Sequence, residues 1–217
     1  MKTRKRKRVL EILAVVLVFA TLAWPAASAA TTWTEDPDAG KDVANAQVTS
    51  AAGPLDAIFG TVGEPDDVAD LFEIRANGAT LTAKIVDHTD VFLFLFDAGG
   101  SGIAGVDCIS GCEISAAVTD GEVYYLGVSA TPWFPYNASD PPIALFVDSD
   151  FDGIFEVNNA DALSGWSSSG SLPLDPPFYI DLTGVNPATQ AVPEPASLLL
   201  LGSGLLGLGA ATWRGRR

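Results

Sequence analysis

The 217-residue sequence has few of the side chains on which catalysis and nucleic-acid binding most often depend. It contains one histidine, His88, and no G-x-S-x-G motif, so the usual serine–histidine–aspartate arrangement has no basis in it. Between residues 30 and 190 only three residues are basic, Lys41, Arg75 and Lys84, against 25 acidic ones. The net charge of this part, −22, repels nucleic acid and anionic lipid and favours divalent cations. We therefore predict a protein that is not an enzyme and has no nucleic-acid partner.

Most of the basic residues outside residues 30–190 lie near the N-terminus. Six basic residues before position 9 precede an apolar core over residues 9–24, and Ala27-Ser28-Ala29 forms an A-x-A cleavage site. This order predicts a signal peptide over residues 1–29, with a helical core, that is read by the Sec translocon and removed by signal peptidase. The alternative is an uncleaved signal anchor.

The C-terminus has three parts in a fixed order. An uncharged run over residues 198–212 with its neighbours reaches about 18 residues, which is enough for a transmembrane helix. Arg214, Arg216 and Arg217 follow it and belong on the cytoplasmic side. The run is preceded by a short motif made of Val192, Pro193, Glu194 and Pro195.

This tail, residues 192–217, resembles the PEP-CTERM sorting signal of bacteria that make exopolysaccharide. The resemblance implies that the exported protein is anchored transiently in the inner membrane. It also implies that an exosortase processes the chain near the Pro-Glu-Pro and that the protein then reaches the cell surface or the extracellular space. The alternative is a plain C-terminal membrane anchor.

Strand patterns dominate the middle of the chain. Residues 71–75 alternate, with Phe72 and Ile74 directed inward, and residues 81–85 alternate in the same way. Asn77-Gly78 lies between these two segments and is the strongest short signal for a β-hairpin. The sequence therefore predicts that the two segments pair with each other.

The full set of strand patterns predicts an all-β fold. Residues 91–96 are apolar throughout, which predicts a strand buried on both faces. With about nine short strands separated by turn residues, the chain is expected to form a β-sandwich of jelly-roll type. We divide the chain into a signal peptide (1–29), an N-terminal segment (30–54), the sandwich (55–184), a linker (185–191) and the tail (192–217).

Three segments of the predicted sandwich resemble the bacterial pre-peptidase C-terminal (PPC-like) domain. They are residues 70–74, 90–97 and 120–129, in the order of that family's strand motifs. The resemblance implies a non-catalytic accessory or surface β-sandwich. Many members have an Asn-Asp-Asp turn where this chain has Val106-Asp107-Cys108. Cys108 and Cys112, the only cysteines, are predicted to form one structural disulfide because the exported compartment is oxidising.

An Asp-rich stretch after residue 147 is the best candidate for a metal site. Its D-x-D-x-D-G pattern places three carboxylates at alternate positions of a tight loop, as Ca²⁺ prefers. It is not an EF-hand, because the twelfth position is Asn159. The alternative is an acidic turn between two strands. The predicted ligands are Asp148, Asp150, Asp152, the backbone carbonyl of Ile154, and Glu156.

A proline-rich stretch over residues 132–142 presents three aromatic side chains, Trp133, Phe134 and Tyr136. Such rings can stack on sugar rings, and the alternative is that they cover one end of the sandwich. We predict an exported surface or matrix protein, sorted by an exosortase, with a structural or adhesive role in exopolysaccharide or biofilm. The rival prediction is a calcium-assisted carbohydrate-binding module.

Overall fold

Every element of the computed structural model is a β-strand, so the predicted all-β class is confirmed. The structure describes residues 31–63, 67–86, 90–108, 112–148, 153–168 and 177–190. The predicted signal-peptide helix and transmembrane helix lie outside these residues. Among the described residues, no helix is long and apolar enough to span a membrane.

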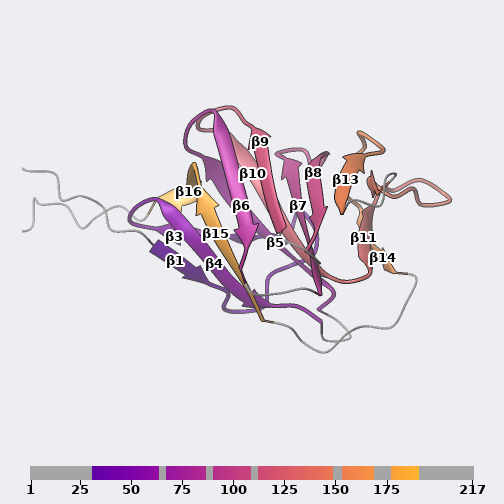
Figure 1. The fold of residues 1–217 in the computed structure, drawn as a ribbon, viewed down its shortest axis with the longest axis horizontal. Helices are drawn as coiled ribbons and strands as arrows, with labels where there is room; N and C mark the ends of the chain where they lie inside the picture. The colour runs from indigo at the N-terminus through magenta and orange to yellow at the C-terminus, as the bar shows by residue number, and fades with distance from the viewer. Residues whose placement is uncertain are drawn as a thin grey trace, which may run out of the picture.

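Two sheets form the body of the protein (Figure 1). The five-stranded sheet has, in spatial order, β1 (Thr31–Thr34), β4 (Leu55–Thr61), β15 (Pro177–Thr183), β6 (Thr80–Ile85) and β9 (Cys112–Ala117). The eight-stranded sheet runs through β12 (Phe146–Val147), β13 (Ile154–Val157), β8 (Gly102–Asp107), β7 (Val91–Asp97), β10 (Val123–Ala130), β5 (Ala69–Ala76) and β16 (Val185–Pro187), and β2 (Gln47–Val48) pairs with β5.

Two small ribbons complete the fold. β11 (Trp133–Tyr136) pairs with β14 (Gly165–Ser168), and β3 (Ser50–Ala51) pairs with β17 (Thr189–Gln190). In Figure 1, β11 and β14 lie at the opposite side of the molecule from β1 and β16. The two sheets form a sandwich, as predicted. Its jelly-roll type stays a prediction.

Strand β7 has a hydrophobic core on each of its faces. Val91, Leu93 and Leu95 belong to the cluster between the two sheets, where they meet residues of β4, β6 and β15. Phe92, Phe94 and Phe96 belong to a second cluster on the outer face of the eight-stranded sheet. The continuous apolar run predicted this double burial, which is confirmed.

The second core is covered by a part of the chain whose sequence has no regular strand pattern. Leu145, Phe146, Phe155, Leu163 and Trp166 close over the phenylalanines of β7. Leu163 and Trp166, with β14, come from residues 158–177, a stretch rich in Ser, Gly, Pro and Asn whose composition is typical of a loop. Isolated large apolar residues in that stretch anchor it, because burying each one removes a large area from water.

The predicted hairpin at Asn77-Gly78 is wrong. β5 pairs with β10, β16 and β2, whereas β6 pairs with β15 and β9, so the two strands lie in different sheets. The turn carries the chain from one sheet to the other, and Gly78 adopts a φ of 116° there. β5 is mostly buried on both faces and takes an interior position, whereas the alternating β6 suits a sheet with one solvated face.

The sheets extend beyond both predicted boundaries of the sandwich. The N-terminal segment supplies β1, β2 and β3. The stretch predicted as a linker supplies β16 and β17, which pair with β5 and β3. These strands have only two to four residues, too few for a period-two pattern to identify them. The predicted Cys108–Cys112 disulfide is confirmed, with the two Cα atoms 4.4 Å apart.

Gly184 allows the tight turn between β15 and β16. Its φ is 73°, and a Cβ at this position would overlap the backbone oxygen of Thr80. We expect Gly184→Ala to lower the free energy of unfolding by more than about 3 kcal/mol, since a left-handed conformation and a backbone clash both oppose it. Chemical denaturation measures this loss.

Gly121 provides the matched control for Gly184. Its φ is 79°, but a Cβ there would have no neighbour within 4 Å. Gly121→Ala should therefore cost only the conformational part, about 1 kcal/mol. Equal losses in the two variants would contradict the close approach of Gly184 to β6.

Candidate functional site

Three acidic side chains from distant parts of the chain meet at one end of the sandwich. Carboxylate oxygens of Glu35, Asp38 and Asp70 all lie within 4.8 Å of one another. Glu35 directly follows β1 of the five-stranded sheet, and Asp70 lies in β5 of the eight-stranded sheet. We call these three residues the acidic cluster. It joins the two sheets.

Glu35 is held in place by backbone donors. The N–H of Ala39 donates to its Oε1 at 2.6 Å, and the N–H of Thr61 donates to its Oε2 at 3.1 Å. A Cβ at Gly60 would overlap this Oε2, so only glycine lets the carboxylate approach β4 so closely. Each oxygen keeps a lone pair beyond these bonds, and Glu35 can therefore also ligate a cation.

Asp70 is the most unusual member of the acidic cluster. Its exposed fraction is 0%, and neither of its carboxylate oxygens has a hydrogen-bond donor within reach among the described residues. Burial, then the nearby charges of Glu35 and Asp67, and then a hydrogen bond with Glu35 raise the pKa of Asp70 to about 11. In the absence of a cation, Asp70 therefore carries a proton at neutral pH.

The acidic cluster borders a cavity through one of its members, Asp38. This cavity has a volume of about 220 Å³ and is lined by Asp38, Asp67, Asp42 and Asn45, among others. Asn45 Nδ2 donates to both carboxylate oxygens of Asp42 at 2.9 Å, which fixes that wall. Ca²⁺ takes six to eight oxygen ligands, and carboxylates, backbone carbonyls and water can supply them here. The donor set fits a hard divalent cation.

No sequence motif pointed to the acidic cluster, because its members are separated by up to 35 positions. One signal was nevertheless present. The alternation that directs Phe72 and Ile74 inward also directs Asp70 inward, since side chains repeat every second residue along a strand. A carboxylate on the buried face of a strand requires a hydrogen-bond donor, a proton or a cation, so Asp70 was a candidate ligand from the sequence.

The predicted calcium loop is described only in part. Asp148 Oδ2 accepts a hydrogen bond from the N–H of Gly153 at 3.3 Å, as a turn-closing aspartate does. Ile154 and Glu156 follow in β13 with exposed side chains, and Ile154 is 60% exposed. Asp150 and Asp152 lie outside the described residues, so this loop stays a prediction.

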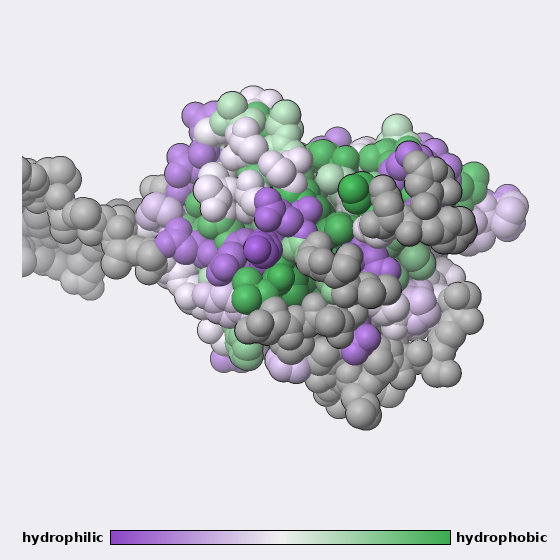
Figure 2. Space-filling view, in the orientation of Figure 1, coloured by the Kyte–Doolittle hydropathy of each residue, from purple (hydrophilic) through white to green (hydrophobic). Residues whose placement is uncertain are grey.

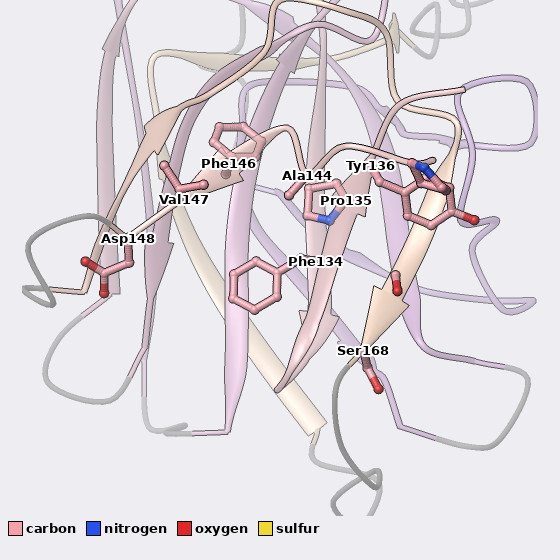
Figure 3. Close-up of a pocket in the computed structure, with 10 residues that line it drawn as sticks. Phe134, Pro135, Tyr136, Ala144, Phe146, Val147, Asp148 and Ser168 are labelled. Carbon is pink, nitrogen blue, oxygen red and sulfur yellow. The ribbon is translucent and has the colours of Figure 1, made fainter. Parts of the chain in front are cut away.

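The three predicted stacking residues separate into two cavities. Phe134 and Tyr136 line a groove of about 570 Å³, in which the ring of Phe134 lies between Val147 and Tyr136 (Figure 3). Trp133 instead lines a neighbouring cavity with Tyr136 and Trp166. One side of Phe134 also packs on the second core, with ring centroids 4.8 Å from Phe92 and 5.4 Å from Phe155. Phe134 therefore covers the core and lines the groove at once.

Hydrophobic side chains reach the surface near this groove. Figure 2 shows them on the side of the molecule where β13 lies. The exposed apolar residues of β12 and β13 are Val147, Ile154 and Val157.

Comparison with known proteins places the tail but not the sandwich. Residues 191–217 match the PEP-CTERM protein-sorting motif. No curated protein matches the chain. A similar solved structure is that of Aeromonas hydrophila PliG, a periplasmic lysozyme inhibitor of g-type lysozyme, at 12% identity and a TM-score of 0.32, covering 71% of this chain and 100% of that one. The PPC-like resemblance stays a prediction. The sorting motif, which includes the residues Val192 to Pro195, implies an exported protein that is anchored in the membrane before an exosortase processes it.

Proposed function

We propose that this is a non-catalytic protein of the cell surface or extracellular matrix, structural or adhesive within exopolysaccharide, whose sandwich is fastened by calcium at the acidic cluster. The Sec translocon and signal peptidase export it, and an exosortase sorts it. The acidic surface between residues 30 and 190 suits a soluble matrix component. Calcium is abundant outside the cell and suits a cluster of this composition.

A single observation carries the calcium proposal, namely the burial of Asp70 among other carboxylates without a donor. An ionised carboxylate buried among other carboxylates is costly, so it takes up a proton or binds a cation. A divalent cation bound by Glu35, Asp38 and Asp70 would neutralise the repulsion. It would also connect the end of β1 in one sheet to β5 in the other and so act as a structural cross-link between the sheets.

Calcium binding should release a proton. Because Asp70 is protonated in the cation-free protein, the ion must displace about one proton as it binds at neutral pH. Titration calorimetry of the full chain in detergent, in two buffers with different ionisation enthalpies, measures the number released. Asp148→Asn, in the predicted loop, should leave this proton release unchanged, whereas Asp38→Asn should weaken calcium binding. Binding heat that is lost in Asp148→Asn and kept in Asp38→Asn would move the site to the loop.

The stability of the protein should depend on pH much more strongly without calcium than with it. Asp70 has a folded-state pKa of about 11 against an ordinary value of 3.8, so its contribution to stability is complete below about pH 4 and is lost as the pH rises toward 11. In chelator, we expect the melting temperature to fall between about pH 5 and pH 9. In excess calcium the fall should be much smaller, because the ion replaces the proton. Parallel curves would argue against the metal centre.

The second candidate function is the calcium-assisted carbohydrate-binding module. The observation that favours it is the groove lined by Phe134 and Tyr136, whose volume of about 570 Å³ is ordinary for a ligand site. Binding of soluble oligosaccharides to the purified protein separates this function from a purely structural role.

A further inference from the structure

Three cavities adjoin along one side of the domain. Tyr136 lines both the groove and the neighbouring cavity, which has a volume of about 310 Å³ and also contains Trp133 and Trp166. Lys41 and Asp42 line both this middle cavity and the cavity beside the acidic cluster. We call the three cavities together the track. Neighbouring cavities of the track share lining residues, and Asp38 of the acidic cluster lines the last of them.

The walls of the track are fixed by contacts within the fold. Trp166 Nε1 donates to the backbone oxygen of Lys41 at 2.7 Å, which ties β14 to the segment around residue 41. Tyr136 lies against the backbone of β14, where a Cβ at Gly165 would come within 2.7 Å of the Tyr136 hydroxyl oxygen. A site whose rings are already held in place loses little conformational entropy on binding. The track is therefore suited to a ligand that must be oriented along its length.

The chemistry of the track favours an uncharged, hydroxyl-rich ligand. Its groove section combines aromatic and proline rings, among them Phe134 and Tyr136, with the hydroxyls of Ser167 and Ser168 at the edge. Among the described lining residues of all three cavities, Lys41 is the only cation. The acidic lining residues are Asp38, Asp42, Asp67 and Asp148.

Sugar rings match this combination. Their apolar C–H faces can lie on aromatic rings, and their hydroxyls can donate to carboxylates, which accept strong hydrogen bonds. The same carboxylates repel a polyanion. Because three cavities follow one another, the ligand that fills them is a chain of several rings.

We propose that the track binds an extended, uncharged polysaccharide chain, with Tyr136 at its centre. The inference rests on the proposed matrix function, since it names the polymer class that the surface protein would hold. Trp133 and Phe134 take different places along the chain, Trp133 in the middle cavity and Phe134 in the groove. Adhesion then follows because one protein binds several sugar units of a neutral glycan.

The test uses the full chain in detergent, with saturating calcium, and uncharged β-1,4-glucan, β-1,3-glucan and α-mannan oligosaccharides of three and six sugars. We expect at least one hexasaccharide to bind about tenfold more tightly than its trisaccharide, because only the longer chain reaches a second cavity. A polyuronate of the same length should bind more weakly. Calorimetry or microscale thermophoresis gives the affinities.

Variants at the centre of the track make the test specific. Tyr136→Ala should weaken hexasaccharide binding about tenfold, whereas Tyr179→Ala, which removes a half-buried tyrosine from β15, should leave it unchanged. Gly165→Ala keeps the ring and displaces it, so it should give a similar loss if Tyr136→Ala does not fold.

Three outcomes would overturn the proposal that the track binds an uncharged polysaccharide. They are no binding to any uncharged hexasaccharide, equal binding of trisaccharide and hexasaccharide, and tighter binding of the polyuronate. Calcium binding is measured separately, without sugar. A track that fails while calcium still binds overturns the polysaccharide inference alone, and loss of calcium binding overturns the metal centre.

Discussion

Asp70→Asn should stabilise the calcium-free protein and abolish its stabilisation by calcium. The amide has the shape of the carboxyl group but never ionises, and it can donate to Glu35 as the protonated carboxyl group does. Folding of the wild-type chain at neutral pH requires Asp70 to take up a proton, because its pKa rises from 3.8 to about 11. The substitution removes that requirement.

The expected effect is large. Neutral pH lies about three units above the ordinary carboxyl pKa, and each unit corresponds to about 1.4 kcal/mol, so the calcium-free variant gains up to about 4 kcal/mol. Differential scanning calorimetry in chelator and in calcium measures both effects.

Asp56→Asn is the control, because Asp56 is an exposed aspartate of β4 and the chemical change is the same. We expect it to shift neither curve. Destabilisation by Asp70→Asn in both conditions would contradict the candidate metal centre and would indicate a hydrogen-bonding role for the carboxylate.

Phe94→Ala should produce the largest loss of stability among the second-core residues. Its side chain is 0% exposed, and its ring lies 5.1 Å from that of Phe146, 5.6 Å from that of Phe155 and 5.7 Å from that of Trp166. Removing it leaves a cavity beneath the segments that form the groove. We expect the free energy of unfolding to fall by about 4 kcal/mol, as for other buried phenylalanines.

Phe59→Ala is the matched control for Phe94→Ala. Phe59 lies in β4 and is 40% exposed, so its truncation should cost less than about 1 kcal/mol. Urea unfolding of the two variants gives both values. Similar small losses would mean that the residues covering the outer face of the eight-stranded sheet do not pack on it.

The sequence predicted burial much better than it predicted pairing. The double burial of β7 follows from its unbroken apolar run, and the inward side chains of β5 and β6 follow from alternation. Pairing failed at Asn77-Gly78 because a turn with a positive φ serves a hairpin and a crossing between sheets equally well. The local sequence does not contain the information that decides between them.

The candidate site shows the same limit. Asp70 belongs to an alternating strand, so its direction was predictable, but Glu35 reaches it only through the parallel pairing of β1 with β4. That pairing depends on the whole fold rather than on any motif. Sugar stacking by the aromatic stretch stays a prediction, and the separation of Trp133 from Phe134 depends on the ribbon that β11 forms with β14.

The last described strands determine how mechanical force enters the domain. β17 ends at Gln190, and the sorting motif begins at residue 191. Tension on the C-terminal tail therefore reaches β17 first and loads its parallel hydrogen bonds with β3. β3 belongs to the N-terminal segment that contains Glu35, so a calcium ion at the acidic cluster would help to hold this segment against the load.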